Sequence, residues 1–157
     1  GPQRPRLLVR TGAGLVEYEP SIDVAARNLG QTVRSLRAMG KRVVIIAPPP
    51  VNGMDIGGCL ERTATGKFVF GAQPGCEIPV AEVRAARALE NEFLARVARD
   101  ANVKVIGFDA ILCDARNCKT RIGNTFVYRD SIHFSVEGSV LVAKKMDLTR
   151  RVAKEAR

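Results

Sequence analysis

The sequence predicts an α/β domain in three layers, with helices on both faces of a mostly parallel sheet. Two observations indicate this fold class. Strand-like and helix-like segments alternate along the chain, which is typical of a parallel sheet with crossover helices. In addition, residues 41–47 (Lys-Arg-Val-Val-Ile-Ile-Ala) hold a continuous β-branched run of the kind that is buried on both faces of such a sheet. The 157 residues, 46% of them apolar, suffice for a core, and we expect a single domain over residues 1–157.

The first elements are predicted to be a strand and a helix. Residues 6–10 (Arg-Leu-Leu-Val-Arg) are typical of a short strand, and the turn after it contains Gly12 and Gly14, which tolerate positive φ. A helix is expected from Ser21, a suitable N-cap, to a stop at Gly40. Its apolar residues recur at helical spacing and should face the core: Ile22, Ala25, Leu29, Val33 and Leu36.

The middle of the chain is predicted to contain a long loop between two strands. Three prolines at 48–50 end the strand at 41–47. Residues 51–79 show little periodicity and are expected to form an insertion loop that is pinned by a disulfide. A helix is predicted over 80–102, followed by a strand over 103–108 (Val-Lys-Val-Ile-Gly-Phe).

Charge and hydropathy limit the possible partners. The chain carries 25 Lys and Arg against 16 Asp and Glu, a net charge of +9, which permits an anionic partner such as nucleic acid, acidic polysaccharide or lipid headgroups. Aromatic residues are only 5% and Trp is absent, which argues against a stacking platform for single-stranded nucleic acid. No run approaches the ~20 apolar residues of a transmembrane helix. We therefore expect no nucleic-acid partner and no transmembrane segment in these residues.

Four cysteines, Cys59, Cys76, Cys113 and Cys118, favour an oxidising compartment. Their even number and local spacing favour two disulfides, Cys59–Cys76 and Cys113–Cys118, although three connectivities are formally possible. A four-thiolate zinc site is an alternative, but the paired C-x-x-C spacing that structural zinc prefers is missing. Four reduced, buried thiols in a cytosolic chain are the other alternative. Disulfides predict a location such as the bacterial periplasm.

The only histidine, His133, lies three residues after Asp130. The pair is expected between a short extended piece at 124–128 and a closing helix over about 136–152. A histidine beside a carboxylate suits hydrolysis or acyl transfer, because the imidazole removes a proton from a nucleophile while the acid fixes its tautomer. A solitary histidine is also a common structural residue, so the pattern alone leaves both interpretations open. Ser135, by contrast, is expected only to cap the helix that follows.

The sequence around this pair resembles the final block of the SGNH (GDSL-type) hydrolases. Residues 128–138 (Tyr-Arg-Asp-Ser-Ile-His-Phe-Ser-Val-Glu-Gly) are similar to Tyr-Arg-Asp-x-x-His-Leu-Ser-x-x-Gly. That pattern belongs to the periplasmic SGNH domains fused to membrane acyltransferases that O-acetylate bacterial surface polysaccharides. Residues 40–48, Cys59-Leu60 and Leu112-Cys113 add support in the same order, and the resemblance covers most of residues 6–145.

The resemblance implies that His133 is the general base and that Asp130 is the acid that orients it. It implies no metal ion and no organic cofactor. The family's nucleophile lies in a Gly-Asp-Ser block and its oxyanion Asn in a Gly-x-Asn-Asp block, and neither occurs in this sequence. At the matching strand end the chain has Arg10-Thr11-Gly12, so Arg10 and Gly12 are the expected oxyanion or substrate contacts. The expected fold is therefore SGNH-like and incomplete at the N-terminus, the C-terminal portion of a larger domain, or else a degenerate relative that binds without catalysis.

The function that the resemblance implies is O-acetyl transfer to a bacterial surface polysaccharide through a Ser-His-Asp acyl-enzyme, with the serine outside this chain. The implied partners are a bacterial glycan, an acetyl donor and a membrane acyltransferase domain in the same full-length protein. The implied location is the periplasm, with the full-length protein anchored in the inner membrane. The alternatives are a GDSL-type esterase or deacetylase, an inactive carbohydrate-binding SGNH-like domain, and a basic nucleic-acid-binding module.

Overall fold

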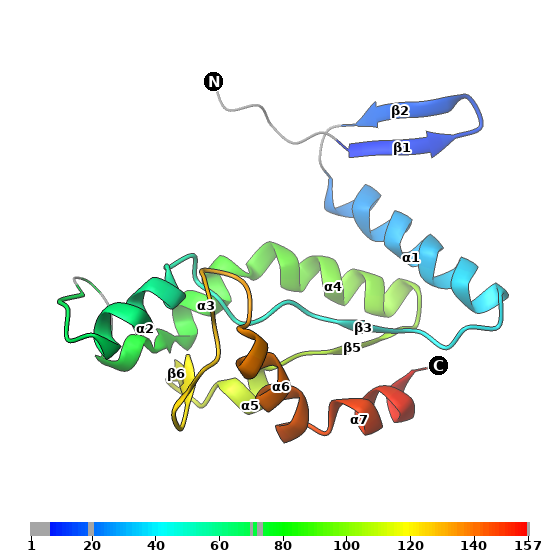
Figure 1. The fold of residues 1–157 in the computed structure, drawn as a ribbon. Coiled ribbons are helices and arrows are strands. Elements are labelled where there is room, and N and C mark those ends of the chain that lie inside the picture. Colours follow the sequence, from blue (N-terminus) through cyan, green and yellow to red (C-terminus); the bar gives the residue numbers. More distant parts are fainter. Residues whose placement is uncertain (1–6, 19–20, 70, 72–73, 157) are drawn as a thin grey trace.

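The computed structural model describes residues 7–18, 21–69, 71 and 74–156 (Figure 1). Its centre is a parallel pair of strands, β3 (Val44–Ile46) and β5 (Lys104–Ile106). Side chains of successive strand residues point to opposite faces of a sheet. Accordingly, Val44 packs against one core cluster and Ile45 against another. The α/β class is confirmed. The strand predicted over 41–47 extends only over 44–46, however, and it is not buried on both faces, because Ile46 is 45% exposed.

Helices supply the two layers outside the strands. On one side α1 (Ile22–Ala38) packs on α4 (Ala88–Asp100), and their buried cluster is Ala26, Val33, Val97, Ala101 and Val103. The other cluster includes Leu112 of α5 (Asp109–Leu112) and Val142 of α6 (Val136–Lys145), together with Ile106 of β5. In Figure 1, α4 and α6 lie on opposite sides of the two strands. The predicted helix after Ser21 is confirmed, and Gly40 beyond its end has a φ of 73°.

The N-terminal strand forms a hairpin instead of joining the parallel pair. The strand β1 (Leu7–Thr11) pairs antiparallel with β2 (Gly14–Tyr18), so that Thr11 lies opposite Gly14. Two residues connect the strands, and Gly14 takes a φ of 112° at the end of this tight turn. The strand predicted at residues 6–10 is confirmed for 7–10, but it pairs in a hairpin and not with β3 or β5; residue 6 lies outside the described residues. Local closure by a two-residue turn favours the hairpin.

The segment 51–79 contains regular structure that the sequence pattern did not reveal. It holds the helix α2 (Ile56–Ala64), the 3-10 turn η1 (Pro74–Cys76) and the strand β4 (Ile78–Pro79). The side chain of Asp55 caps α2 by accepting the N–H of Gly58 at 3.0 Å. Two adjacent glycines in the first turn are poor helix formers and concealed the helix. The predicted Cys59–Cys76 disulfide is confirmed, and it joins α2 to η1.

Two of the three predicted helices are broken in two, whereas α1 is continuous. The first of these two is interrupted at Arg87, which lies between α3 (Val80–Ala86) and α4 with a φ of −100°. The buried guanidinium of Arg87 pairs with Glu90 and Asp109. The closing helix splits at Asp147, whose φ of 47° is left-handed, into α6 and α7 (Leu148–Glu155). No described helix has the combination of length and apolar composition that a membrane span requires.

Short strands complete the fold near the C-terminal half. The strand β6 (Asn117–Cys118) pairs antiparallel with β4, and the predicted Cys113–Cys118 disulfide is confirmed. The strands β7 (Arg121–Ile122) and β8 (Thr125–Phe126) form a second hairpin, which overlaps the extended piece expected at 124–128.

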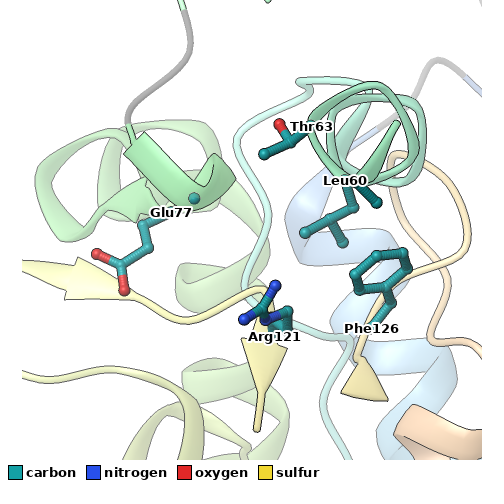
Figure 2. A pocket seen from close by; sticks show the side chains of 7 residues that line it. Leu60, Thr63, Glu77, Arg121 and Phe126 are labelled. Atoms are coloured by element: carbon teal, nitrogen blue, oxygen red, sulfur yellow. The ribbon is translucent and has the colours of Figure 1, made fainter. Parts of the chain in front are cut away.

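Two neighbouring hollows lie between α2 and the β7–β8 hairpin. The first, of about 280 Å³, is lined by Leu60, Thr63, Glu77, Arg121 and Phe126 among others (Figure 2). The second, of about 480 Å³, shares Phe126 with the first and extends to Arg129. Residue 129 directly precedes the predicted catalytic pair, so the second hollow reaches the rim on which that pair lies.

Candidate active site

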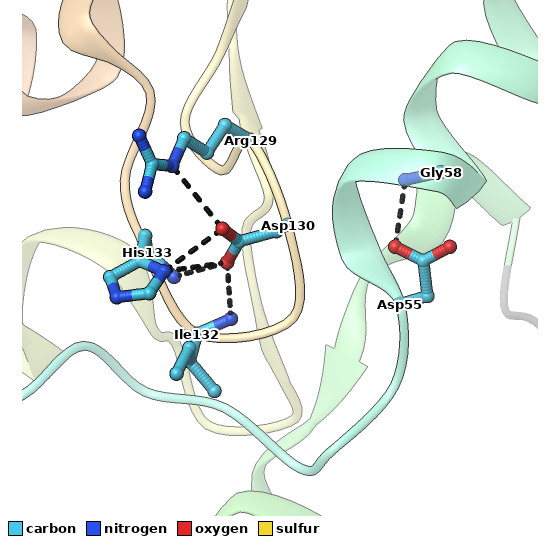
Figure 3. Close-up of polar contacts among 6 residues, drawn as sticks. All are labelled: Asp55, Gly58, Arg129, Asp130, Ile132 and His133. Atoms are coloured by element: carbon cyan, nitrogen blue, oxygen red, sulfur yellow. Dashed lines mark hydrogen bonds and ion pairs between the residues drawn. The ribbon is translucent and has the colours of Figure 1, made fainter.

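The Asp130 carboxylate is held by backbone N–H groups in a tight turn before α6 (Figure 3). Its Oδ1 accepts the N–H of Ile132 at 2.9 Å and the N–H of His133 at 2.7 Å. The Nε of Arg129 approaches Oδ2 at 3.2 Å. An aspartate that accepts backbone N–H groups two and three residues ahead stabilises the turn by itself. Asp130 is therefore fixed before it makes any contact with the imidazole.

The imidazole of His133 contacts the same carboxylate. Its Nδ1 lies 2.9 Å from Oδ2 of Asp130 and 3.1 Å from Oδ1. Because a carboxylate can only accept, Nδ1 carries the proton of this hydrogen bond, and Nε2 of the neutral ring is then an unprotonated base. Among the described residues, Nε2 has no hydrogen-bond partner. The side chain of His133 is 56% exposed, so Nε2 is accessible from outside the domain.

Ionisation of Asp130 is favoured by these contacts. The N–H of Ile132 lowers the pKa of the carboxyl most, followed by the side chain and then the backbone N–H of His133. The carboxylate is therefore negative at neutral pH. A fixed negative charge beside Nδ1 stabilises the imidazolium that forms when Nε2 takes up a proton.

Packing around the turn fixes where the pair lies. Phe134 packs edge-on against Phe108 and Tyr128, with ring centroids 5.1 and 5.3 Å apart. The buried Tyr128 hydroxyl donates to the carbonyl oxygen of Pro50 at 2.7 Å, which ties the turn to the end of β3. On the other side Gly57 of α2 lies against the backbone of Arg129, where a Cβ would overlap the carbonyl. The turn is thus held from both the strand end and α2.

Helix α6 starts directly after the turn through the predicted cap. The hydroxyl of Ser135 accepts the N–H of Gly138 at 2.8 Å and donates to the carbonyl oxygen of Phe126 at 2.6 Å. Ser135 is therefore occupied as a helix cap and is not a nucleophile in this arrangement. A Cβ on Gly138 would overlap the backbone of Val127, so the glycine allows the close helix contact.

The other predicted contacts lie elsewhere. The structure does not bring Arg10 and Gly12 to the Asp130–His133 pair. Both lie on the β1–β2 hairpin, beyond the N-terminal end of α1 in Figure 1, whereas the pair precedes α6. A Cβ on Gly12 would have no atom within 4 Å. Within the described part of the chain, no group of three or more His, Cys, Asp and Glu side chains could hold a metal ion.

Three contributions to the site were not anticipated from the sequence. Arg129 forms an ion pair with Asp130, Tyr128 reaches Pro50, and Gly57 allows α2 to contact the turn. Arg129 could have been found, since it is adjacent to Asp130. The contacts of Tyr128 and Gly57 span more than seventy residues of sequence, and no local pattern announces them.

A family match covers most of the chain, including the turn that carries Asp130 and His133. Residues 6–147 match the model of the SGNH domain that is fused to AT3 domains. The chain is a member of this SGNH family. The matched range includes Asp130, His133 and all four cysteines. No curated protein sequence shows significant similarity to this SGNH domain.

A solved structure has the same fold. It is the periplasmic domain of the lipopolysaccharide acetyltransferase of Salmonella ser. Paratyphi A, with a TM-score of 0.59 at 17% sequence identity. The match covers 82% of the present SGNH domain and 50% of the Salmonella chain. The present chain therefore spans about half of the length of that structure.

Proposed function

We propose that this SGNH domain contributes the His–Asp part of a Ser-His-Asp site that transfers acetyl groups to a bacterial surface polysaccharide. The observation that carries the proposal is the orientation of His133. Asp130 holds Nδ1 at 2.9 Å, and the opposite ring nitrogen has no protein partner among the described residues. An imidazole that is fixed at one nitrogen and free at the other is what a general base needs.

The proposed reaction has two steps with one covalent intermediate. A serine supplied by residues outside this chain gives its proton to Nε2 of His133, and its Oγ attacks the carbonyl carbon of the acetyl donor. The leaving group departs with the proton from Nε2, and an acetyl-serine remains. A sugar hydroxyl then gives its proton to Nε2 and attacks the acetyl carbon, and the serine oxygen leaves with that proton. In each step Asp130 stabilises the imidazolium.

The cellular setting of the proposal follows from the family and the disulfides. The family's SGNH domains are fused to AT3 domains, so the acetyl donor is expected to reach the site through a membrane acyltransferase domain of the same protein. Two disulfides suit an oxidising compartment, and the Salmonella relative is a periplasmic domain. We therefore propose a periplasmic domain of an inner-membrane protein.

The test is O-acetyl content of the surface glycan in cells that carry the full-length protein. His133→Ala should lower acetylation at least about 100-fold, because removal of a general base costs typically 10²–10⁴-fold. Ser139→Ala is the matched control, since the exposed Ser139 hydroxyl bonds only the carbonyl of Val136 in the same helix. Unchanged acetylation in His133→Ala, at equal protein level, removes the proposal and leaves a binding domain.

A further inference from the structure

The two hollows beside α2 share Phe126 as a lining residue, and together they form a groove. The larger hollow includes Arg129, which directly precedes the Asp130–His133 pair. Along α2, Gly57 and Glu61 line the larger hollow, and Leu60 and Ala64 line the smaller one. Residues at this spacing share one face of a helix. The same face of α2 therefore passes from one hollow to the next, and Phe126 belongs to both.

The opposite wall is the β7–β8 hairpin. Arg121 and Phe126 are directly paired across the hairpin, so their side chains lie on the same face. Figure 2 shows the Arg121 side chain between Glu77 and Phe126. From Phe126 the chain runs through Arg129 to Asp130, four residues that span at most about 14 Å when extended. The groove thus leads from Arg121, past Phe126, to the rim that carries His133.

The chemistry of the lining indicates which ligand fits. The lining contains charged, amide and hydroxyl side chains: Glu61, Glu77, Glu137, Arg121, Arg129, Asn124, Thr63, Thr125, Tyr128 and Ser135. Sugar hydroxyls both donate and accept, so carboxylates and guanidiniums can each bind them. The partly buried ring of Phe126 offers the apolar surface that sugar C–H groups need.

Charge separates two classes of glycan. The carboxylate of Glu77 accepts a hydrogen bond from Asn117, which leaves Glu61 and Glu137 to balance Arg121 and Arg129 in the lining. Arg129 is in addition already paired with Asp130. A polymer that carries a carboxylate or phosphate on each repeat therefore meets no excess of positive charge there, although the chain as a whole has a net charge of +9. An uncharged polyhydroxylated chain needs no such excess.

We propose that this groove binds an uncharged oligosaccharide segment of the acceptor, with Phe126 between two sugar-binding hollows and the acetylated residue at the Arg129 end. The inference rests on the proposed acetyl transfer and adds its substrate class and position. Volumes of about 280 and 480 Å³ lie near or within the range of about 300–1,000 Å³ that is usual for small-ligand sites.

The test measures binding separately from chemistry. Two sets of hexasaccharides are titrated against the isotope-labelled chain: uncharged ones built from glucose, galactose, mannose, rhamnose or N-acetylglucosamine, and acidic ones built from galacturonate or glucuronate. At least one uncharged hexasaccharide should shift the amide resonances of α2 and β7–β8, with an affinity that does not depend on salt. Tighter binding of the acidic set, or no shift in these segments with any uncharged sugar, overturns the inference.

Three single-residue variants test which side chains of the groove contact the oligosaccharide. Phe126→Leu keeps an apolar side chain but removes the flat ring. Glu61→Gln and Arg121→Gln change exposed polar groups without altering the core. Each of the three variants should weaken oligosaccharide binding about five- to tenfold. Arg150→Gln on α7 is the control for loss of a positive charge and should bind like the wild type. Equal affinity of Phe126→Leu, Glu61→Gln and Arg121→Gln with the wild type rejects the groove.

The two proposals fail in different ways. His133→Ala should bind the oligosaccharide as tightly as the wild type, because the groove ends before the imidazole. Binding without acetyl transfer by the full-length protein retains the groove and removes the reaction. Acetyl transfer that is unaffected by Phe126→Leu and Arg121→Gln retains the reaction and removes the groove.

Discussion

Replacing Asp130 with Asn should reverse the tautomer of His133 while it preserves the turn. The amide oxygen of Asn can still accept the N–H groups of Ile132 and His133, which now go to Oδ1. The amide nitrogen then occupies the place of Oδ2 and donates toward Nδ1, where it meets a second donor. The ring relieves this conflict by moving its proton to Nε2. In this tautomer Nε2 can no longer accept the proton of a nucleophile.

The size of the effect follows from the exposure of the pair. A carboxylate-to-amide change in a buried Ser-His-Asp triad lowers kcat about 10⁴-fold. Here the side chains of Asp130 and His133 are 42% and 56% exposed, and solvent weakens the field of the carboxylate. We therefore expect acetyl transfer by the full-length protein to fall about 10²- to 10³-fold, with the protein level unchanged. The assay measures the amount of ester-bound acetate that the purified surface glycan carries.

Asp114 provides a matched control within the chain. Its Oδ1 accepts the N–H groups of Arg116 and Asn117, both at 2.8 Å, in the same type of turn but without a histidine. Asp114→Asn should therefore leave acetyl transfer unchanged. Equal loss in both variants would mean that the Asp130 turn only supports the fold, and retained activity in Asp130→Asn would refute the orienting role.

Three further predictions concern the framework. Gly57→Ala should destabilise the protein by about 1–3 kcal/mol in urea unfolding and lower acetyl transfer, because the new Cβ displaces the Arg129 backbone; an unchanged unfolding midpoint would contradict this contact. Loss of the Cys59–Cys76 disulfide, which closes a separation of 17 residues, should cost about 3 kcal/mol, against about 2 kcal/mol for Cys113–Cys118 with its separation of 5; urea unfolding of the two double Cys→Ser variants tests this order. The pKa of Asp130 is lowered in the folded protein, so its ionisation stabilises the fold above the unfolded pKa of about 3.9, and this contribution is lost as the pH falls below about 4. Asp130→Asn should consequently lose less stability than the wild type between pH 5 and pH 2, and equal losses would count against the lowered pKa.

Sequence patterns predicted the elements that are determined by residues close together in the chain. A strand within 41–47, the helix after Ser21 and both disulfides could be predicted because β-branched runs, caps and close cysteines act over short distances, whereas the full burial expected for that strand was wrong. The motif at 128–138 similarly located Asp130 and His133, since the carboxylate and the imidazole belong to one turn.

Other features depend on contacts that sequence spacing does not encode. The break at Arg87 coincides with a buried guanidinium that pairs with Glu90 and Asp109, and Asp109 comes from a different helix. The helix α2 was missed because Gly57 and Gly58 suppress its helical signal, yet Gly57 is needed for contact with the catalytic turn. The antiparallel pairing of β1 with β2 was likewise not predicted.

The most direct test of the account is ¹⁵N NMR of the imidazole of neutral His133 in the folded chain. We expect a protonated Nδ1 and an unprotonated Nε2 in the wild type, and the reverse in Asp130→Asn. A wild-type ring with its proton on Nε2, or a tautomer that does not respond to Asp130→Asn, would contradict the role of this pair as an oriented base.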